Sequence, residues 1–505
     1  MSNWLFDRLK PGPGDAARPF ILAHGAQAAM SHGDLLTRSA RLAHALVWLG
    51  VVPGDRVAVQ VEKSVDALML YLACVRAGAV FLPLNTAYTP NELAYFIGDA
   101  EPRVVVVTPE REAVSAPLAA GVGARCVTLG TAGEGNLPPL AAEAPDIFED
   151  VARGADDLAA ILYTSGTTGR SKGAMLSHDN LASNAATLVD YWRFSSDDVL
   201  IHALPIFHTH GLFVATNTIL MARASMVFLP RFDPREVLSL MPGATCLMGV
   251  PTFYVRLLAE EGLTRAVAGP MRLFVSGSAP LLAETHLAFE ARTGHAILER
   301  YGMTETNMNT SNPYDGARVP GTVGFPLPGV ALRVADPESG APLPQGEIGM
   351  IEVAGANVFK GYWRMPEKTA AEFRPDGFFI TGDLGMIDAE GYVHIVGRGK
   401  DLVISGGFNV YPKEVEGEID ALPGVIESAV IGVPHPDFGE GVTAVVVPEK
   451  GAARDGAAIL AALDGRLAKF KQPKAVVFID ELPRNTMGKV QKALLRETYR
   501  DLYQG

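Results

Sequence analysis

A glycine- and hydroxyl-rich segment that ends in a lysine has the clearest chemical potential in the chain. Residues 163–173 read Tyr-Thr-Ser-Gly-Thr-Thr-Gly-Arg-Ser-Lys-Gly and follow an apolar stretch, residues 158–162, that predicts a strand. Glycines let a ligand approach the backbone N–H groups, hydroxyls add further donors, and Lys172 adds a positive charge. Such a segment suits the binding of a polyphosphate, although its composition is also typical of a flexible surface turn.

Two common phosphate-binding patterns are absent from the 505 residues: a Walker A loop, GxxxxGK followed by Ser or Thr, and a GxGxxG dinucleotide fingerprint. Five further motifs follow the loop in order along the chain. They are Ser276-Gly277-Ser278-Ala279-Pro280, Tyr301-Gly302-Met303-Thr304-Glu305, Thr381-Gly382-Asp383, Gly397-Arg398-Gly399-Lys400-Asp401 and Pro483-Arg484-Asn485-Thr486-Met487-Gly488-Lys489. The ordered set resembles the acyl-adenylate-forming superfamily, which includes acyl-CoA synthetases, peptide-synthetase adenylation domains and luciferases.

The resemblance implies a binding site for ATP and its adenylate product. Tyr301 would stack on adenine, Thr304 would contact the α-phosphate, and Asp383 with Arg398 would bind the ribose hydroxyls. The full set implied for ATP is Thr164, Ser165, Gly166, Thr167, Thr168, Gly169, Lys172, Ser278, Ala279, Pro280, Tyr301, Gly302, Met303, Thr304, Asp383, Arg398 and Lys489. Without the ordered motifs, each residue has an ordinary structural explanation, such as a turn acid or a core tyrosine.

The catalytic residues implied by the resemblance are Lys489, Glu305 and His208. Glu305 and Thr164 would hold Mg²⁺, a hard cation that prefers oxygen ligands and substrate phosphates. Attack of a carboxylate on the α-phosphate spreads negative charge that fixed cations must stabilise, and Lys489 would supply one of them. A C-terminal lysine among basic residues is otherwise typical of a solvated surface.

Family members remove this lysine for the second half-reaction, in which the CoA thiol attacks the adenylate. They rotate the C-terminal domain about a hinge residue that corresponds to Lys400, beside Gly397 and Gly399. The analogy also suggests control by a lysine acetyltransferase and deacetylase acting on Lys489, because acylation would remove its charge. For CoA itself the candidates are Gly406 and Gly407, which lie in a predicted turn, and Lys469 and Lys471. The two lysines form a basic run that is also typical of a solvated face.

The acid to be activated is indicated by Arg300, directly before the Tyr-Gly-Met-Thr-Glu motif. By family geometry this position approaches the acyl pocket, where a guanidinium could pair bidentately with a second carboxylate. The alternative is that Arg300 pairs with Glu299 or another acidic residue and only supports the structure. His208, in the family's pocket-lining turn at residues 204–211, and Ser278 are the other substrate candidates; a lone histidine is more often a core residue.

Residues 298–309, Leu-Glu-Arg-Tyr-Gly-Met-Thr-Glu-Thr-Asn-Met-Asn, closely resemble malonyl-CoA synthetases. The resemblance implies a ligase that forms malonyl-CoA, AMP and pyrophosphate from malonate, ATP and CoA, with methylmalonate as an extension. Three alternatives stay open. They are a synthetase for another acid (oxalate, a short fatty acid or an aromatic acid), a stand-alone enzyme that loads a carrier protein, and a catalytically dead adenylate-binding protein.

The elements that must position these residues alternate between helix and strand. Helices are predicted at 35–49 and 64–76 and strands at 56–61 and 104–108, which favours an α/β fold with parallel strands. Strands follow at 346–354 and 391–397, then a helix at 410–419, strands at 425–433 and 442–447, and a helix at 459–467. We expect a large N-terminal domain, residues 1–399, of layered α/β subdomains with, by resemblance, a distorted β-barrel part. A small mobile α+β domain, residues 400–505, would follow the hinge at Lys400.

Composition excludes several other classes. The net charge of −13 argues against nucleic-acid binding, and 48% hydrophobic with 20% charged residues argues against global disorder. The three cysteines are far apart, which argues against a zinc site and a disulfide framework and fits a reducing cytosol. The N-terminus has no signal-peptide pattern, and the most apolar stretch, residues 67–84, contains Arg76 and Pro83. We expect a cytoplasmic protein without a membrane span.

Overall fold

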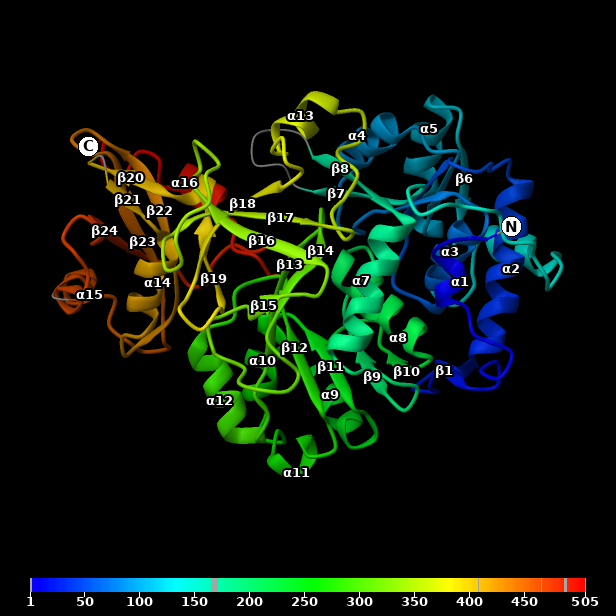
Figure 1. Cartoon of the computed structure of the whole chain (residues 1–505), viewed down its shortest axis with the longest axis horizontal. Helices are drawn as coiled ribbons and strands as arrows, with labels where there is room; N and C mark the ends of the chain where they lie inside the picture. Colours follow the sequence, from blue (N-terminus) through cyan, green and yellow to red (C-terminus); the bar gives the residue numbers. More distant parts are fainter. Residues whose placement is uncertain (1, 165–170, 407, 465, 486–487, 505) are drawn as a thin grey trace. The chain divides into compact units, whose positions relative to one another are not determined.

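The computed structural model describes residues 2–164, 171–406, 408–464, 466–485 and 488–504 (Figure 1). The chain forms two compact units. The first comprises Met1–Ala331 and Ala354–Phe379, and the second comprises Leu332–Val353 and Ile380–Gly505. The expected mixed α/β fold, with a large N-terminal and a small C-terminal part, is confirmed. A domain boundary and hinge at Lys400 stay a prediction.

The first unit contains a six-stranded sheet in the order β6-β5-β3-β4-β7-β8. Its strands are β3 (Arg56–Gln60), β4 (Val80–Pro83), β5 (Val104–Val107), β6 (Arg125–Thr128), β7 (Leu158–Thr164) and β8 (Lys172–Ser177). All neighbours pair in parallel except β7 and β8, which are antiparallel. The four valines of β5 are fully buried, which explains why an unbroken β-branched run predicted this strand.

A nine-stranded sheet lies in the same unit, in the order β15-β14-β13-β12-β11-β9-β10-β1-β2. Its strands are β1 (Pro19–Ile21), β2 (Met30–Ser31), β9 (Val199–His202), β10 (Ser225–Phe228), β11 (Cys246–Gly249), β12 (Leu273–Ser276), β13 (Leu298–Met303), β14 (Asn307–Ser311) and β15 (Phe325–Pro326). Strands β10, β9, β11, β12 and β13 pair in parallel. Their carboxyl ends therefore meet at one edge of the sheet, which is where α/β proteins bind ligands.

Helices and short turns make up the remaining regular structure described in the first unit. The helices are α1 (Phe6–Leu9), α2 (His32–Trp48), α3 (Val65–Arg76), α4 (Pro90–Ala100), α5 (Glu112–Gly121), α6 (Leu137–Ala142), α7 (His178–Tyr191), α8 (Thr216–Ala222), α9 (Pro234–Leu240), α10 (Pro251–Leu258), α11 (Arg265–Ala268), α12 (Ala283–Thr293) and α13 (Pro366–Ala371). Short turns are η1 (Pro109–Arg111), the π-helix η2 (His210–Ala215) and η3 (Met241–Gly243). The helix expected at 35–49 begins three residues earlier, because Ser31 and Asp34 form a capping box.

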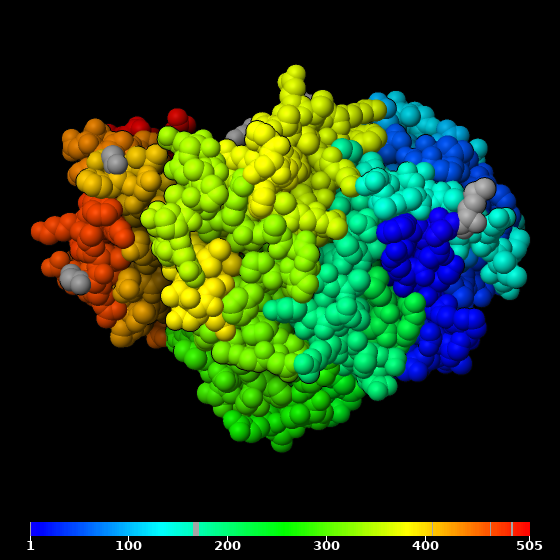
Figure 2. Space-filling view, viewed as in Figure 1, coloured from blue at the N-terminus to red at the C-terminus, as the bar shows by residue number. Residues whose placement is uncertain are grey.

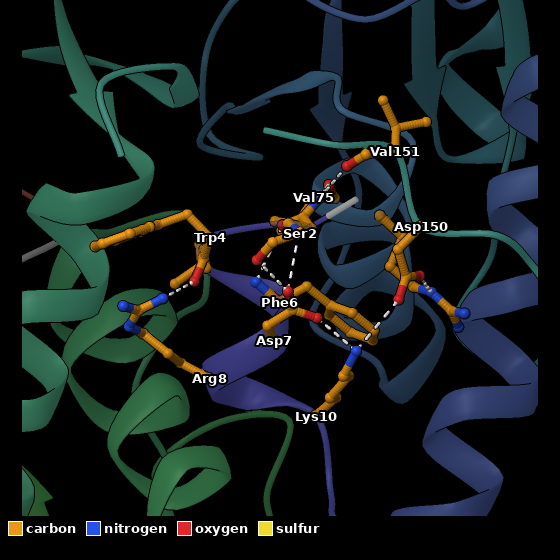
Figure 3. A network of polar contacts seen from close by, with 12 residues as sticks. Ser2, Trp4, Phe6, Asp7, Arg8, Lys10, Val75, Asp150 and Val151 are labelled. Carbon is orange, nitrogen blue, oxygen red and sulfur yellow. Dashed lines mark hydrogen bonds and ion pairs between the residues drawn. The ribbon is translucent and has the colours of Figure 1, made fainter. Parts of the chain in front are cut away.

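Polar contacts anchor the N-terminus within this unit (Figure 3). The Asp7 carboxylate accepts hydrogen bonds from the Ser2 hydroxyl at 2.6 Å and from the Lys10 ammonium. Lys10 also lies 3.9 Å from a carboxylate oxygen of Asp150. In Figure 2 the dark blue N-terminal residues accordingly lie against the cyan and teal segment that follows residue 150.

The second unit holds two smaller sheets. One has the order β16-β17-β18-β19, formed by β16 (Val330–Ala335), β17 (Gly349–Gly355), β18 (Phe379–Ile387) and β19 (Val393–Arg398). In the described residues this part of the chain is thus a four-stranded sheet, where the resemblance implied a distorted barrel. The other sheet contains β20 (Val403–Ser405), β21 (Phe408–Val410), β22 (Val425–His435), β23 (Gly439–Pro448) and β24 (Ala475–Phe478).

Helices α14 (Pro412–Asp420), α15 (Gly456–Leu463) and α16 (Lys492–Thr498) and the turn η4 (Gly399–Asp401) complete this unit. The helix expected at 410–419 begins later, because Val410 ends β21 and Pro412 supplies the first helical position. Along the parts of the chain that the structure describes, no helix is long and apolar enough to cross a membrane.

Candidate active site

Two of the expected residues, Ser278 and Arg300, lie near the edge formed by the carboxyl ends of β9, β11, β12 and β13. His202 ends β9, Gly249 ends β11 and Ser276 ends β12. On β13, Glu299 lies opposite Ser276, so that Arg300 follows at the level where β12 leaves the sheet. The first unit therefore presents Arg300 at the edge where a ligand site is expected.

Arg300 is deeply buried and lacks a full set of partners. Only 4% of the residue is exposed, and its Nε and Nη2 atoms have no hydrogen-bond partner among the described residues. Burial lowers the pKa of Arg300 to about 9. A buried cation without hydrogen bonds is unfavourable, so the geometry indicates an anionic ligand.

The alternative that Arg300 serves as a partner of Glu299 does not hold in the structure. Successive residues of a strand point to opposite faces. The Glu299 carboxylate contacts the His286 ring, with Oε1 and Nδ1 3.2 Å apart. No ion pair of Arg300 occurs among the described residues, which leaves its charge for another group.

Gly277 makes room for the guanidinium. A Cβ atom at position 277 would lie 2.3 Å from Cζ and 2.5 Å from Nε of Arg300. Contacts this short are not sterically possible, so the side chain of Arg300 crosses the backbone of the Ser-Gly-Ser motif where only glycine fits. Ser278 follows with a positive φ of 72°, a strained conformation of the kind found at functional sites.

His210 also lies near this arginine, in the same turn as the predicted His208, whose own role stays a prediction. The Nδ1 atom of His210 lies 3.2 Å from the Ser278 hydroxyl, and its Nε2 atom is buried without a partner in the described part of the chain. Burial, and then the charge of Arg300, holds the pKa of His210 well below its usual range, so the ring is neutral near pH 7. His208 precedes it in the same turn, and its Nδ1 atom accepts a hydrogen bond from the His210 backbone N–H at 3.3 Å.

A second polar cluster joins Glu305 to Lys172. The Tyr362 hydroxyl lies 3.0 Å from Glu305 and 2.7 Å from Glu372. Lys172 contacts Glu372 at 3.1 Å and lies 4.1 Å above the Tyr362 ring. Lys172 also pairs across the β7–β8 hairpin with Thr164. The sequence did not indicate Tyr362 and Glu372, because both lie far along the chain from the motifs that contain Lys172 and Glu305. Only the contacts in the folded chain connect them with these two residues.

This cluster fits the expected magnesium ligands. Glu305 is a buried carboxylate, 5% exposed, and Thr164 adds a hydroxyl beside the predicted phosphate loop. No group of three or more His, Cys, Asp or Glu side chains able to hold a metal occurs among the described residues. Mg²⁺ at nucleotide sites needs only one or two carboxylates, because phosphates and water complete its shell.

The remaining predicted ATP residues of the first unit lie in the same region of the chain. Tyr301 and Thr304 are half-buried on and just after β13, and Ala279 and Pro280 follow Ser278. Ser165, Gly166, Thr167, Thr168 and Gly169 lie outside the described residues.

In the second unit the structure brings Asp383 and Arg398 together. They are directly opposite on β18 and β19, and Oδ1 of Asp383 lies 2.7 Å from Nε of Arg398. Asp383 is buried, 4% exposed at its side chain. The ion pair brings the Thr-Gly-Asp and Gly-Arg-Gly-Lys-Asp motifs together on neighbouring strands.

Lys489 is exposed on a turn that Asn485 closes. The Asn485 side chain accepts from the Lys489 N–H at 3.0 Å, and the Asn485 N–H donates to the Lys489 carbonyl at 2.9 Å. The Arg484 guanidinium donates to the Gly488 carbonyl at 2.6 Å and also pairs with Glu427 of β22. The turn is thus fixed to the sheet of its own unit.

The CoA and hinge candidates lie in the same unit. Lys469 is exposed, Lys471 pairs with Glu414 at 2.5 Å, and Gly406 has a φ of 60°, whereas Gly407 lies outside the described residues. Lys400 lies in the turn η4. The CoA and hinge roles of these residues stay predictions.

Two family models and several known proteins match this chain. Residues 13–363 match the AMP-binding enzyme family, and residues 414–489 match the AMP-binding enzyme C-terminal domain. A feruloyl-CoA synthase from an Amycolatopsis species is 39% identical over 504 residues, covering 99% of both chains. A malonate–CoA ligase from Arabidopsis thaliana is 34% identical over 482 residues, covering 89% of this chain and 79% of that one. The crystal structure of ATP-bound MatB from Rhodopseudomonas palustris is 68% identical, covers 100% of both chains and has a TM-score of 0.98.

Proposed function

The chain belongs to the AMP-binding enzyme family and is an AMP-forming acid–CoA ligase, and from this premise we propose that its acid is malonate. The reaction would consume malonate, ATP and CoA and release malonyl-CoA, AMP and pyrophosphate, with malonyl-adenylate as the intermediate. Methylmalonate differs by one methyl group, which changes binding by only about 1–3 kcal/mol. We include it as a second substrate.

The observation that carries the proposal is the buried guanidinium of Arg300. Its Nε and Nη2 atoms lack partners in the described chain, and together they present the two parallel N–H groups that a carboxylate accepts. One carboxylate of malonate would bind there, and the other would remain for attack on ATP. His210, neutral and hydrogen-bonded to Ser278, would add a polar contact beside it.

A monocarboxylic acid suits this pocket less well. Its single carboxylate must react, so Arg300 would stay buried and unpaired in the complex. A hydrogen bond to a charged group contributes about 1.5–3 kcal/mol, and two of them would separate diacids from monoacids by several orders of magnitude.

An aromatic acid is the second candidate, because a relative 39% identical to this chain is named a feruloyl-CoA synthase. An aromatic ring against Arg300 would gain a cation–π contact of about 0.5–2 kcal/mol, but no hydrogen bonds for Nε and Nη2. The malonate–CoA ligase among the relatives favours the diacid. Two charged hydrogen bonds from Arg300 to a carboxylate would contribute more than one cation–π contact, and this difference favours malonate over an aromatic acid.

The ATP-binding roles form part of the proposal. Lys172 and the loop before it would contact the phosphates, Tyr301 the adenine, and Asp383 with Arg398 the ribose. Glu305 and Thr164 would hold Mg²⁺, which when bound neutralises phosphate charge. Lys489 would stabilise the charge that develops at the α-phosphate, and the exposed position of its turn is consistent with entry into a ligand site.

Three further roles are proposed by family analogy alone. Lys400 would be the hinge for the second half-reaction, with Gly406, Gly407, Lys469 and Lys471 as CoA contacts. Acetylation of Lys489 by an acetyltransferase would silence the first half-reaction. A cytoplasmic location and a place in fatty acid metabolism likewise stay predictions.

A pyrophosphate-release screen tests the acid. Malonate, methylmalonate, oxalate, acetate, butyrate and ferulate are each supplied with ATP, with and without CoA. We expect malonate to give the highest kcat/KM and methylmalonate to follow. A higher value for ferulate or for a monocarboxylate would refute the diacid proposal. A second comparison supplies a holo-carrier protein in place of CoA, and a preference for the carrier would refute CoA as the acceptor.

A further inference from the structure

Lys63 is a partly buried lysine that the ATP and acid sites proposed above do not use. It lies between β3 and α3, directly before Ser64, whose hydroxyl caps α3 by accepting from the Ala67 N–H at 3.1 Å. Its ammonium donates to the His202 carbonyl at 2.8 Å and contacts the His202 ring at 3.0 Å. It also lies 4.3 Å above the Phe228 ring. His202 and Phe228 are neighbours in register at the ends of β9 and β10.

The ammonium of Lys63 thus has two polar contacts with His202 and one contact with an aromatic face. No ion pair of Lys63 with a carboxylate occurs within the described ranges, and burial holds the pKa of Lys63 well below its usual value. The lysine therefore compensates its burial only through His202 and an aromatic face. It also joins the six-stranded sheet, through the end of β3, to the nine-stranded sheet that carries the acid site.

The contacts of His202 determine its tautomer. Its Nε2 atom lies 2.9 Å from the Gly211 carbonyl, which can only accept, so Nε2 carries the hydrogen. Nδ1 then carries the lone pair and accepts from Lys63. Burial, and then the charge of Lys63, holds the pKa of His202 well below its usual range, which excludes the doubly protonated ring near pH 7.

The Gly211 carbonyl is in turn the point where the π-helix η2 is held. It accepts from His202 and from the Thr216 hydroxyl, the latter at 3.0 Å. Gly211 packs so closely that a Cβ atom would lie 2.1 Å from the Pro205 carbonyl oxygen. Gly211 directly follows His210, whose ring meets Ser278 at 3.2 Å. A π-helical turn is rare and is frequently found at functional sites.

We propose that Lys63 and His202 are positioning residues for the acid pocket. Lys63 holds His202 as the Nε2–H tautomer, His202 holds the Gly211 carbonyl, and this carbonyl fixes η2 so that His210 meets Ser278 beside Arg300. The proposal rests on the proposed function, because it assigns His210 to the acid rather than to ATP.

The test compares Lys63→Met with Glu62→Gln, a matched control at the exposed neighbouring position. For Lys63→Met the KM for malonate should rise about tenfold or more, equivalent to about 1.4 kcal/mol. The KM for ATP should stay within about twofold, a change below about 0.5 kcal/mol. Lys63→Arg, which keeps a cationic donor, should recover part of the loss. Glu62→Gln should match the wild type in both constants.

A spectroscopic measurement on the wild-type protein needs no substrate. Histidine-selective ¹⁵N NMR of the wild-type protein should show His202 as one Nε2–H tautomer, assigned by its loss in His202→Phe. An Nδ1–H tautomer would overturn the proposal, as would equal rises of the KM values for malonate and ATP in Lys63→Met. If the wild type activates another short acid, the proposed function fails, and the KM for that acid replaces the KM for malonate in the same comparison.

Discussion

Replacement of Arg300 by methionine should make the enzyme more stable and less active at once. Methionine keeps much of the apolar side-chain volume but removes the cation. In the ligand-free protein the guanidinium is 4% exposed, with Nε and Nη2 unpaired among the described residues, so its removal relieves a desolvation penalty of several kcal/mol. The midpoint of thermal unfolding of Arg300→Met without ligands should therefore rise.

The same substitution removes two charged hydrogen bonds from the complex with malonate. At about 1.5–3 kcal/mol each, their loss lowers kcat/KM for malonate by about 10²- to 10⁴-fold. Activity with acetate, which has no second carboxylate, should be unchanged or higher. Pyrophosphate release at several concentrations of each acid, together with scanning fluorimetry, measures all three quantities.

The reasoning would be refuted by either of two results. Unchanged malonate activity would show that Arg300 does not face the acid. A lower unfolding midpoint, with equal loss for all acids, would show that Arg300 supports the structure. Lysine is an informative further substitution, because it keeps the charge and loses the fork that binds a carboxylate bidentately.

Other substitutions test separate parts of the account. Gly277→Ala would place a Cβ atom 2.3 Å from Cζ of Arg300, so kcat/KM for malonate should fall by about tenfold or more while the KM for ATP changes little. Lys489→Ala should abolish pyrophosphate release but spare formation of malonyl-CoA from supplied malonyl-adenylate; equal loss of both half-reactions would contradict the role. Burial raises the pKa of Asp420 to about 6 from 3.8, so the folded protein binds a proton that the unfolded chain releases, and the free energy of unfolding falls as pH rises through this window. Asp420→Asn should flatten this dependence and stabilise the protein at pH 7.5 by at most about 3 kcal/mol, measured by denaturant unfolding across pH; an unchanged slope would contradict the assignment.

Much of the fold follows from local patterns in the sequence. The strand of four valines at 104–107 and the helix that begins near residue 32 are set by β-branched runs and by amphipathic spacing with a capping box. The sheet of β16 to β19 was predicted only in part, because the strands expected at 346–354 and 391–397 match β17 and β19, whereas β16 and β18 were not indicated. Their pairing depends on tertiary contacts that no local pattern contains.

The candidate site shows the same division. The motifs identified Arg300, Glu305 and Lys172 by type and order, but the spacing of residues did not show that Glu299 points away toward His286. The contact of His210 with Ser278 was likewise beyond the sequence, because His208 and His210 lie within one turn and a π-helix begins at His210. The side chain that meets Ser278 depends on that irregular turn.

Tyr362 and Glu372 illustrate a further limit. They lie 57 and 67 residues after Glu305 in the sequence, yet the Tyr362 hydroxyl contacts both carboxylates. A tyrosine and a glutamate in a surface-like segment are ordinary in composition. Only the folded arrangement reveals that they connect Lys172 with Glu305.

The central claim is that a short dicarboxylate is activated because Arg300 pairs with its second carboxylate. The most direct measurement is the ratio of kcat/KM for malonate to that for acetate in the wild type and in Arg300→Met, with ATP and CoA saturating. The account predicts a ratio of about 10² or more in the wild type that falls toward one in the variant. A ratio near one in the wild type, or a large ratio that persists in Arg300→Met, would contradict it.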